Sequence, residues 1–117
     1  MIKFYGYSKC STAKKAKNWL EENNLEFENI EIVKNPPSKE ELKKMYEISG
    51  YELKKFFNTS GVKYRELGLK DIVKSESDDK LLDILSSDGM LIKRPLVYDG
   101  KNVLIGFKVD EWKEKLL

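Results

Sequence analysis

The stretch that decides the fold is residues 2–33, IKFYGYSKCSTAKKAKNWLEENNLEFENIEIV. At its start isoleucine and phenylalanine alternate with lysine and tyrosine, which predicts a short strand that ends near Gly6. Apolar residues at helical spacing predict an amphipathic helix over residues 12–24, and β-branched and aromatic residues interleaved with acids predict a strand over 25–33. Two strands joined by one helix form a βαβ unit, so we expect parallel strands and a right-handed connection.

The segment that follows carries helical signals and no strand signal. Asn-Pro-Pro at residues 35–37 breaks the pattern, and Ser38 with Glu41 has the spacing of a capping box, so we expect a helix over about 39–49. Three further helical pieces are expected near residues 53–57, 64–69 and 79–87. We assign to the core of this segment the residues Phe56, Phe57, Tyr64, Leu67, Leu81, Leu82 and Leu85.

The last part of the chain predicts a hairpin and a helix. Asp99-Gly100 between two short apolar runs supplies the positive φ angles of a tight turn, and Asp110 is expected to cap the final helix. The element order predicts an α/β fold, a thioredoxin-like β-α-β / β-β-α sandwich. We expect one domain over residues 1–117, with a helical insertion at about 38–89 between the second and third strands.

Composition excludes several classes of function. The 22 basic and 20 acidic residues give a net charge of +2 and alternate along the chain, so we expect no direct contact with nucleic acid. No apolar run approaches the roughly 20 residues that span a bilayer, and no signal stretch opens the chain, so we expect a cytoplasmic protein without membrane contact. With no histidine and one cysteine, the chain offers no zinc cluster, Ser-His-Asp triad or internal disulfide, and we expect no bound cofactor.

The one cysteine, Cys10, is predicted to lie at the start of the first helix. Unpaired backbone N–H groups and a partial positive charge at a helix N-terminus favour thiolate over thiol. Lys9 and Lys14 add positive charge, and Ser11 and Thr12 offer hydroxyl donors to the sulfur or to a bound oxyanion. A lone cysteine is more often an inert small apolar residue. The polar residues around this one favour a nucleophile instead.

Arg94-Pro95 directly precedes the third predicted strand. A trans proline is tolerated at the first position of a strand on structural grounds alone. A cis proline would instead expose the backbone of residue 94 beside the thiol and place the Arg94 side chain near a bound anion. The sequence leaves the isomer open.

Three segments carry a resemblance to a known family. IKFYGYSKCSTAKKAKNWLEENNLEFENIEI (2–32), FFNTSGVKYRELGL (56–69) and IKRPLVYDGKNVLIGFK (92–108) resemble the ArsC/Spx family, the arsenate-reductase-related branch of the thioredoxin-like proteins. The resemblance implies a single catalytic cysteine near the N-terminus, matched by Cys10, and a helical insertion in the thioredoxin fold. It also implies an Arg-Pro pair before the third strand, matched by Arg94-Pro95.

The chain departs from both known branches of that family. The resemblance implies three arginines around the oxyanion of an arsenate reductase, and this chain has Ser60 and Lys108 at two of those positions and Arg94 at the third. Arg65 lies five residues beyond Ser60 and is the candidate substitute. Spx-type regulators use a Cys-x-x-Cys redox switch, and Ala13 stands at the second cysteine position here.

We therefore expect an enzyme, a thiol-dependent monothiol oxidoreductase. The Cys10 thiolate would attack a disulfide or an oxidised or oxyanion substrate, and glutathione or another low-molecular-weight thiol would release the adduct as co-substrate. The expected partners are a small thiol, an oxidised protein thiol and glutaredoxin. Two alternatives stay open: an arsenate reductase, and a non-enzymatic Spx-like regulator that binds RNA polymerase. The expected substrate-binding residues are Ser11, Thr12, Arg94, Pro95 and Lys108.

Overall fold

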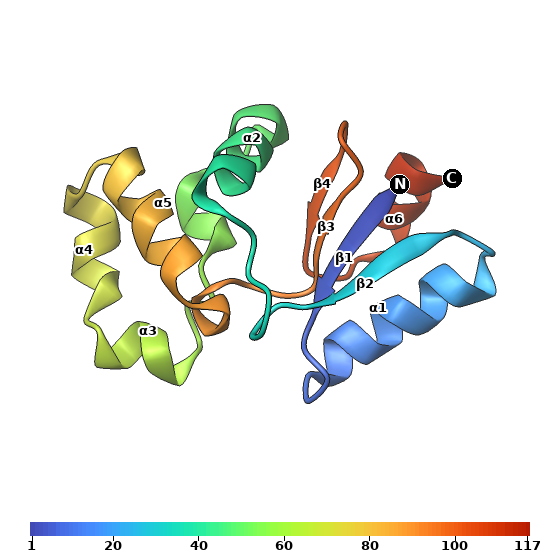
Figure 1. Cartoon of the computed structure of the whole chain (residues 1–117), viewed down its shortest axis with the longest axis horizontal. Coiled ribbons are helices and arrows are strands. Elements are labelled where there is room, and N and C mark those ends of the chain that lie inside the picture. The colour runs from blue at the N-terminus through green and yellow to red at the C-terminus, as the bar shows by residue number, and fades with distance from the viewer.

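The computed structural model describes all residues from 1 to 117 and contains a four-stranded sheet with the order β2-β1-β3-β4. The first two strands are parallel, and the last two form an antiparallel hairpin that pairs with β1 (Figure 1). This arrangement confirms the predicted α/β sandwich. The strands are β1 (Ile2–Gly6), β2 (Phe27–Glu31), β3 (Leu96–Tyr98) and β4 (Val103–Ile105).

The helix between the parallel strands, α1 (Ser11–Glu22), buries one face against the sheet. Its buried residues Ala13, Ala16 and Leu20 lie at the spacing that the sequence indicated. The helix begins one residue earlier than predicted and ends at Glu22, because the chain leaves helical geometry at Asn23 and reaches a positive φ of 57° at Asn24. No helix in the structure is long and apolar enough to cross a membrane.

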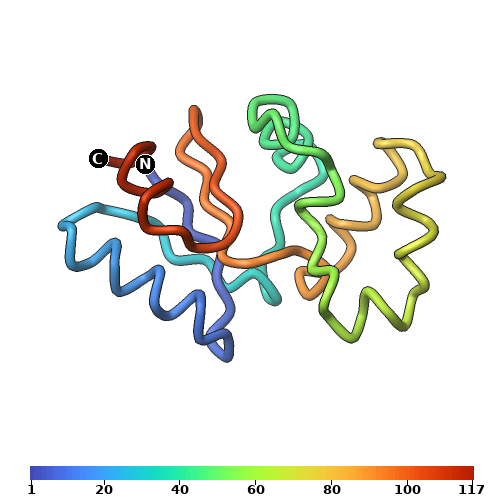
Figure 2. Tube along the Cα trace, turned by 180° about the vertical axis from the view of Figure 1, so that it is seen from behind, coloured from blue at the N-terminus to red at the C-terminus, as the bar shows by residue number.

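The two faces of the sheet pack against different helices. Phe4, Val97 and Leu104 belong to a core shared with α1 and with α6 (Val109–Leu116). Their strand neighbours Tyr5, Leu96 and Ile105 belong to a second, larger core shared with the helices of the insertion. Successive side chains of a strand point to opposite faces, so the sheet divides the molecule into two layers of helices (Figures 1 and 2).

All named elements of the insertion between β2 and β3 are helices. The single helical piece expected near residues 64–69 is two helices, separated by Gly68 with a φ of 63°. The assignment of Leu67 to the core is wrong, because its position next to this bend leaves it 53% exposed. The helices of the insertion are α2 (Lys39–Ser49), η1 (Leu53–Phe56), α3 (Val62–Glu66), α4 (Leu69–Ser75), α5 (Asp78–Ser87) and η2 (Gly89–Leu91).

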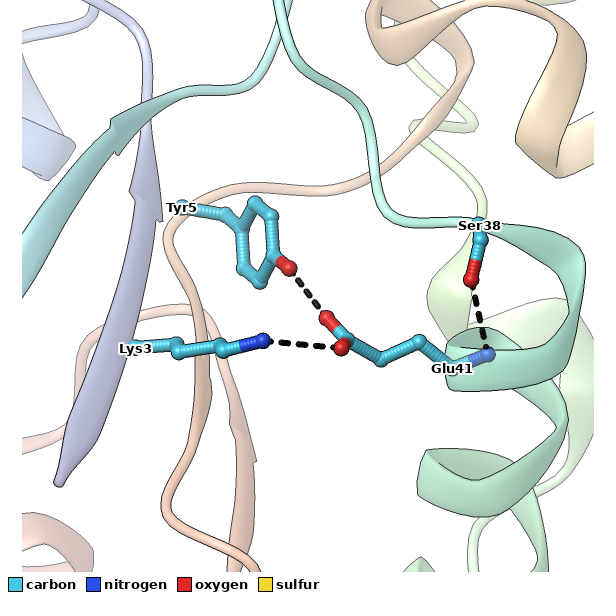
Figure 3. Close-up of polar contacts among 4 residues, drawn as sticks. All are labelled: Lys3, Tyr5, Ser38 and Glu41. Atoms are coloured by element: carbon cyan, nitrogen blue, oxygen red, sulfur yellow. Dashed lines mark hydrogen bonds and ion pairs between the residues drawn. The ribbon is translucent and has the colours of Figure 1, made fainter.

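Of the two N-caps predicted from the sequence, the structure confirms the one at α2 and not the one at α6. Ser38 caps α2 as predicted, since its Oγ accepts a hydrogen bond from the Glu41 amide at 3.1 Å. The Glu41 carboxylate does not return the bond; it accepts hydrogen bonds from Tyr5 and Lys3 of β1 and so ties α2 to the sheet (Figure 3). The prediction that Asp110 caps α6 is wrong, because the N-cap is Lys108 and Asp110 lies within the first turn.

Candidate functional site

Cys10 is the N-cap residue of α1, reached by a tight turn after β1. Its backbone amide donates to the carbonyl oxygen of Tyr7 at 2.9 Å, which closes the turn. The side chain is partly buried beside the core under α1 and also lines an open cleft. The Cys10 sulfur accepts no capping hydrogen bond from the amides of the first turn of α1.

The N-terminal end of α1 has unused hydrogen-bond donors. The amides of Ser11, Thr12 and Ala13 donate to no oxygen of the protein. The first turn of the helix carries no acidic residue. Free amides and the positive end of the helix dipole form a favourable environment for a bound anion at this place.

Arg94 approaches the cleft from the chain that leads into β3. The Arg94-Pro95 bond is cis, which answers the question that the sequence left open, and Pro95 itself is buried. Nε and Nη1 of Arg94 are the only buried side-chain nitrogens or oxygens in the protein without a hydrogen-bond partner. An unsatisfied buried donor costs about 1–3 kcal/mol, so this guanidinium is expected to serve a ligand.

The cleft beside Cys10 has a volume of about 440 Å³, within the range of small-molecule sites. Four basic residues and no acidic residue line it, a larger positive excess than the net charge of +2 of the whole chain. The cleft is therefore suited to an anionic ligand. Its lining residues are Cys10, Thr12, Lys55, Asn58, Ser60, Lys93, Arg94, Ile105, Gly106, Phe107 and Lys108.

Backbone pairing between two distant segments brings part of this lining into place. Phe57 forms an isolated antiparallel bridge with Ile92. On either side of it, the amide of Asn58 donates to the carbonyl oxygen of Leu91 and the amide of Lys93 donates to that of Phe56, both at 2.8 Å. The loop that carries Asn58 and Ser60 is thereby held next to the segment that carries Lys93 and Arg94.

The structure brings together four of the residues that the sequence singled out: Cys10, Thr12, Arg94 and Lys108 line one cleft. Ser11 is exposed beside Cys10 and contributes no side chain to the cleft, and Pro95 is buried outside it. Arg65 does not substitute for a missing arginine. It lies outside the lining, and its Nη1 donates to the carbonyl oxygen of Ser60 at 3.3 Å.

Sequence reasoning missed other members of the cleft, above all Lys55, Asn58 and Lys93. Lys55 is exposed, as expected for a solvated face, yet it also lines the cleft. Its position next to another lysine gave no signal for this role. Lys93 directly precedes the Arg-Pro pair, and Asn58 opens the polar turn of the middle segment, so proximity to these motifs is the signal that would have found them.

Comparison with known proteins supports the resemblance noted in the sequence. Residues 5–115 match the family model described as the ArsC family. The chain is 58% identical over 113 residues to the uncharacterized protein YusI of Bacillus subtilis (strain 168), a match that covers 97% of this chain and 96% of that protein. It is 28% identical over 111 residues to the global transcriptional regulator Spx of Streptococcus agalactiae serotype V, covering 95% of this chain and 80% of the regulator.

A solved structure is similar over the same extent. The crystal structure of a possible arsenate reductase from Streptococcus mutans UA159 superposes with a TM-score of 0.90 at 45% sequence identity. The match covers 97% of this chain and 98% of that one. The similarity therefore includes the sheet, both flanking helices and the helical insertion.

Proposed function

Because the chain belongs to the ArsC family, we propose that it is a monothiol oxidoreductase whose Cys10 thiolate exchanges with a disulfide. The observation that carries the proposal is the position of Cys10 at the N-terminus of α1, on the wall of a cleft with four basic and no acidic residues. Three free amides and this positive charge attract an anionic substrate to Cys10 and stabilise the negative charge of a leaving thiolate.

The proposed reaction has two steps. The Cys10 thiolate attacks one sulfur of a disulfide, a bond forms between Cys10 and that sulfur, and the other half leaves as a thiolate with the bonding electron pair. A second thiol, from glutathione, another small thiol or glutaredoxin, then attacks the mixed disulfide and releases Cys10. The chain has a single cysteine and cannot resolve the adduct by itself, so the second thiol comes from a partner.

The other cleft residues interact with the negative charges of the substrate and of the reacting sulfurs. Arg94 and Lys108 orient the anionic part of the substrate, and the amides of Ser11 and Thr12 stabilise the negative charge on the attacking or leaving sulfur. The hydrogen-bonding capacity of the Arg94 guanidinium that the protein leaves unused supports this role.

Mass spectrometry after exposure to oxidised glutathione tests the proposal. We expect one glutathione adduct, on Cys10, that a small thiol reverses and that Cys10→Ser lacks. We also expect Cys10 to react about tenfold faster than a free-cysteine peptide at the same pH, because the free amides of α1 stabilise the negative charge that develops on the leaving sulfur. The absence of an adduct, or a rate no higher than that of the free peptide, would overturn the proposal.

Arsenate reduction is the second candidate. It is favoured by the unpaired Arg94 nitrogens and by the similarity to the Streptococcus mutans protein. Ser60 and Lys108 weigh against it, because neither supplies the bidentate fork with which a guanidinium holds a tetrahedral oxyanion. The test is turnover of arsenate with glutathione and glutaredoxin. If arsenate causes no oxidation of glutathione above the background, this candidate is dismissed.

A regulator that binds RNA polymerase is the third candidate, from a different class. It is favoured by the similarity to the Spx regulator over 95% of this chain. Retention of the protein on the immobilised C-terminal domain of the RNA polymerase α subunit tests it, and no retention at micromolar concentration removes it. The Cys10→Ser variant separates the classes, since binding is expected to survive this change while thiol exchange is lost.

A further inference from the structure

A second hollow adjoins the cleft of Cys10 and shares Lys55 and Lys93 with it. It has a volume of about 350 Å³. Because the two hollows have two wall residues in common, we treat them as one groove that begins at Cys10 and continues past Lys55 and Lys93. The remaining residues of the second hollow are Glu52, Lys54, Phe57 and Thr59.

The groove is strongly basic. Five basic residues and one acidic residue line the two hollows. None of the five basic residues, Lys54, Lys55, Lys93, Arg94 and Lys108, forms an ion pair within the protein. All ion pairs of the structure use other lysines, namely Lys3, Lys39 and Lys63. The five cations therefore have no ion-pair partner in the protein, and Glu52 is the one acidic residue that offsets part of their charge.

Aromatic rings hold two of these cations in place of acids. The Nζ atom of Lys55 lies 3.9 Å from the centroid of the Tyr51 ring, at the wall common to both hollows. The guanidinium carbon of Arg94 lies 4.8 Å from the centroid of the Tyr7 ring. A ring restrains a cation without cancelling its charge, so these two groups stay available to an anionic ligand.

On the premise of the thiol exchange proposed above, we propose that this groove binds a disulfide whose transferred half is a small thiol with two separated anionic groups. One anionic group binds at Arg94 and Lys108 beside the reacting sulfur, and the other binds in the second hollow at Lys54 and Lys93. The reaction stays the same: the Cys10 sulfur bonds to the sulfur of this thiol, and the other half of the disulfide leaves as a thiolate with the electron pair. The size of the hollows fits a small molecule.

Two matched probes test the charge requirement. One is the mixed disulfide of glutathione with 2-thiopyridine, and the other is the same disulfide made from glutathione diethyl ester, which has both carboxylates masked. Attack by Cys10 releases 2-thiopyridone, whose absorbance gives the rate. The ratio of the two rates is divided by the ratio measured with free cysteine, which removes the intrinsic reactivity of the probes.

We expect the normalised ratio to favour the free carboxylates by about fivefold at low salt and to fall as salt is added. The double variant Lys54→Gln/Lys93→Gln should reduce this preference to about twofold, because Arg94 and Lys108 still bind the first carboxylate. Lys101→Gln, an exposed residue of the β3–β4 turn outside the groove, should retain it. Circular dichroism checks that each variant is folded.

Three outcomes overturn the inference. A normalised ratio near one in the unaltered protein shows that the groove does not select anionic thiols, and the proposed thiol exchange still stands if Cys10 outpaces free cysteine. A preference that is undiminished in Lys54→Gln/Lys93→Gln shows that the second hollow plays no part. A Cys10 that is no faster than free cysteine with either probe contradicts the proposed function itself, and the inference falls with it.

Discussion

The guanidinium carbon of Arg94 lies 4.8 Å from the centre of the Tyr7 ring, and the carbonyl oxygen of Tyr7 accepts the backbone hydrogen bond of Cys10. Tyr7 thus contacts both the expected nucleophile and the expected anion-binding side chain. No sequence pattern singles out this tyrosine. The Tyr7 ring therefore positions the Arg94 guanidinium relative to the turn that carries Cys10.

Replacement of the Tyr7 ring is expected to weaken reactions with anionic substrates selectively. A stacked ring stabilises a cation by about 0.5–1 kcal/mol at a partly exposed site, so we expect Tyr7→Leu to lower the rate of Cys10 with oxidised glutathione about threefold. The rate with the disulfide of 2-mercaptoethanol, which is neutral, should not change. Tyr7→Phe keeps the ring and should behave like the unaltered protein. If Tyr7→Phe is as slow as Tyr7→Leu, the hydroxyl and not the ring is responsible.

Arg94 is expected to matter for reaction and little for stability. Its buried Nε and Nη1 bind no protein acceptor, so their removal breaks no internal hydrogen bond. We expect Arg94→Gln to change the free energy of unfolding by less than about 1 kcal/mol and to lower the rate with oxidised glutathione about tenfold. Arg94→Lys should recover only part of that rate, because an ammonium lacks the planar fork. Urea denaturation and stopped-flow kinetics give the two quantities.

A loss of stability in Arg94→Gln of several kcal/mol, with an unchanged rate, would contradict this view. Arg94 would then act as a structural support for the start of β3. The two measurements are needed together, since a rate loss alone does not separate a binding group from one that holds the backbone in place.

The contact of Glu41 with β1 predicts a pH-dependent stability. Burial would raise the pKa of Glu41, but the hydrogen bonds from Tyr5 and Lys3 together hold it below its ordinary value of 4.5 (Figure 3). The unfolded chain therefore binds the Glu41 proton more readily than the folded one. The contribution is complete above about pH 4.5 and is lost as the pH falls through the folded value.

We expect Glu41→Gln to lower the free energy of unfolding by about 1 kcal/mol at neutral pH, since the Lys3 end of the contact is partly exposed. The difference in the free energy of unfolding between Glu41→Gln and the unaltered protein should become smaller as the pH falls below about 4.5. Glu40→Gln, on the same turn of α2 but exposed, is the control and should show no such narrowing. A difference for Glu41→Gln that stays constant between neutral and acidic pH would show that its charge is not involved.

The sequence predicted the elements around Cys10 because their signals are local. Alternation over five residues and helical spacing over twelve are enough to place a cysteine at the junction of β1 and α1. The hairpin signal of Asp99-Gly100 is local in the same way, but the expected pair of positive φ angles is wrong: only Gly100 has one, of 93°, and the connection spans residues 99–102. The prediction for Asp110 is wrong for a physical reason: an aspartate stabilises a helix both as the N-cap and within the first turn, so the residue type alone does not distinguish the two positions.

The composition of the cleft could not be read from the sequence, because it depends on a contact between distant segments. A single bridge from Phe57 to Ile92 positions Lys55 and Asn58, and one paired residue leaves no periodic pattern. The direction of Arg65 likewise depends on how the 58–61 turn folds back. The carbonyl oxygen of Ser60 accepts its hydrogen bond, and no property of the residue itself indicates this.

Gly89, near the end of the insertion, lies against the backbone just after β2. A Cβ atom on Gly89 would clash with the carbonyl oxygen of Ile32, a backbone atom that cannot rotate away. We expect Gly89→Ala to lower the free energy of unfolding by about 3 kcal/mol. Gly50→Ala is the matched control: it has a φ of 73° and no neighbour within 4 Å, so it carries only the left-handed strain of about 1–2 kcal/mol.

The two glycine variants should differ in function as well as in stability. Gly89 opens η2, which leads through Ile92 into the cleft residues Lys93 and Arg94, whereas Gly50 ends α2 outside the cleft. In the folded protein, the rate of Cys10 with oxidised glutathione should therefore fall in Gly89→Ala and stay unchanged in Gly50→Ala. Urea denaturation and the exchange rate test both points. Equal losses of stability in the two variants would mean that the backbone at Ile32 moves aside, and the cleft would then not depend on this contact.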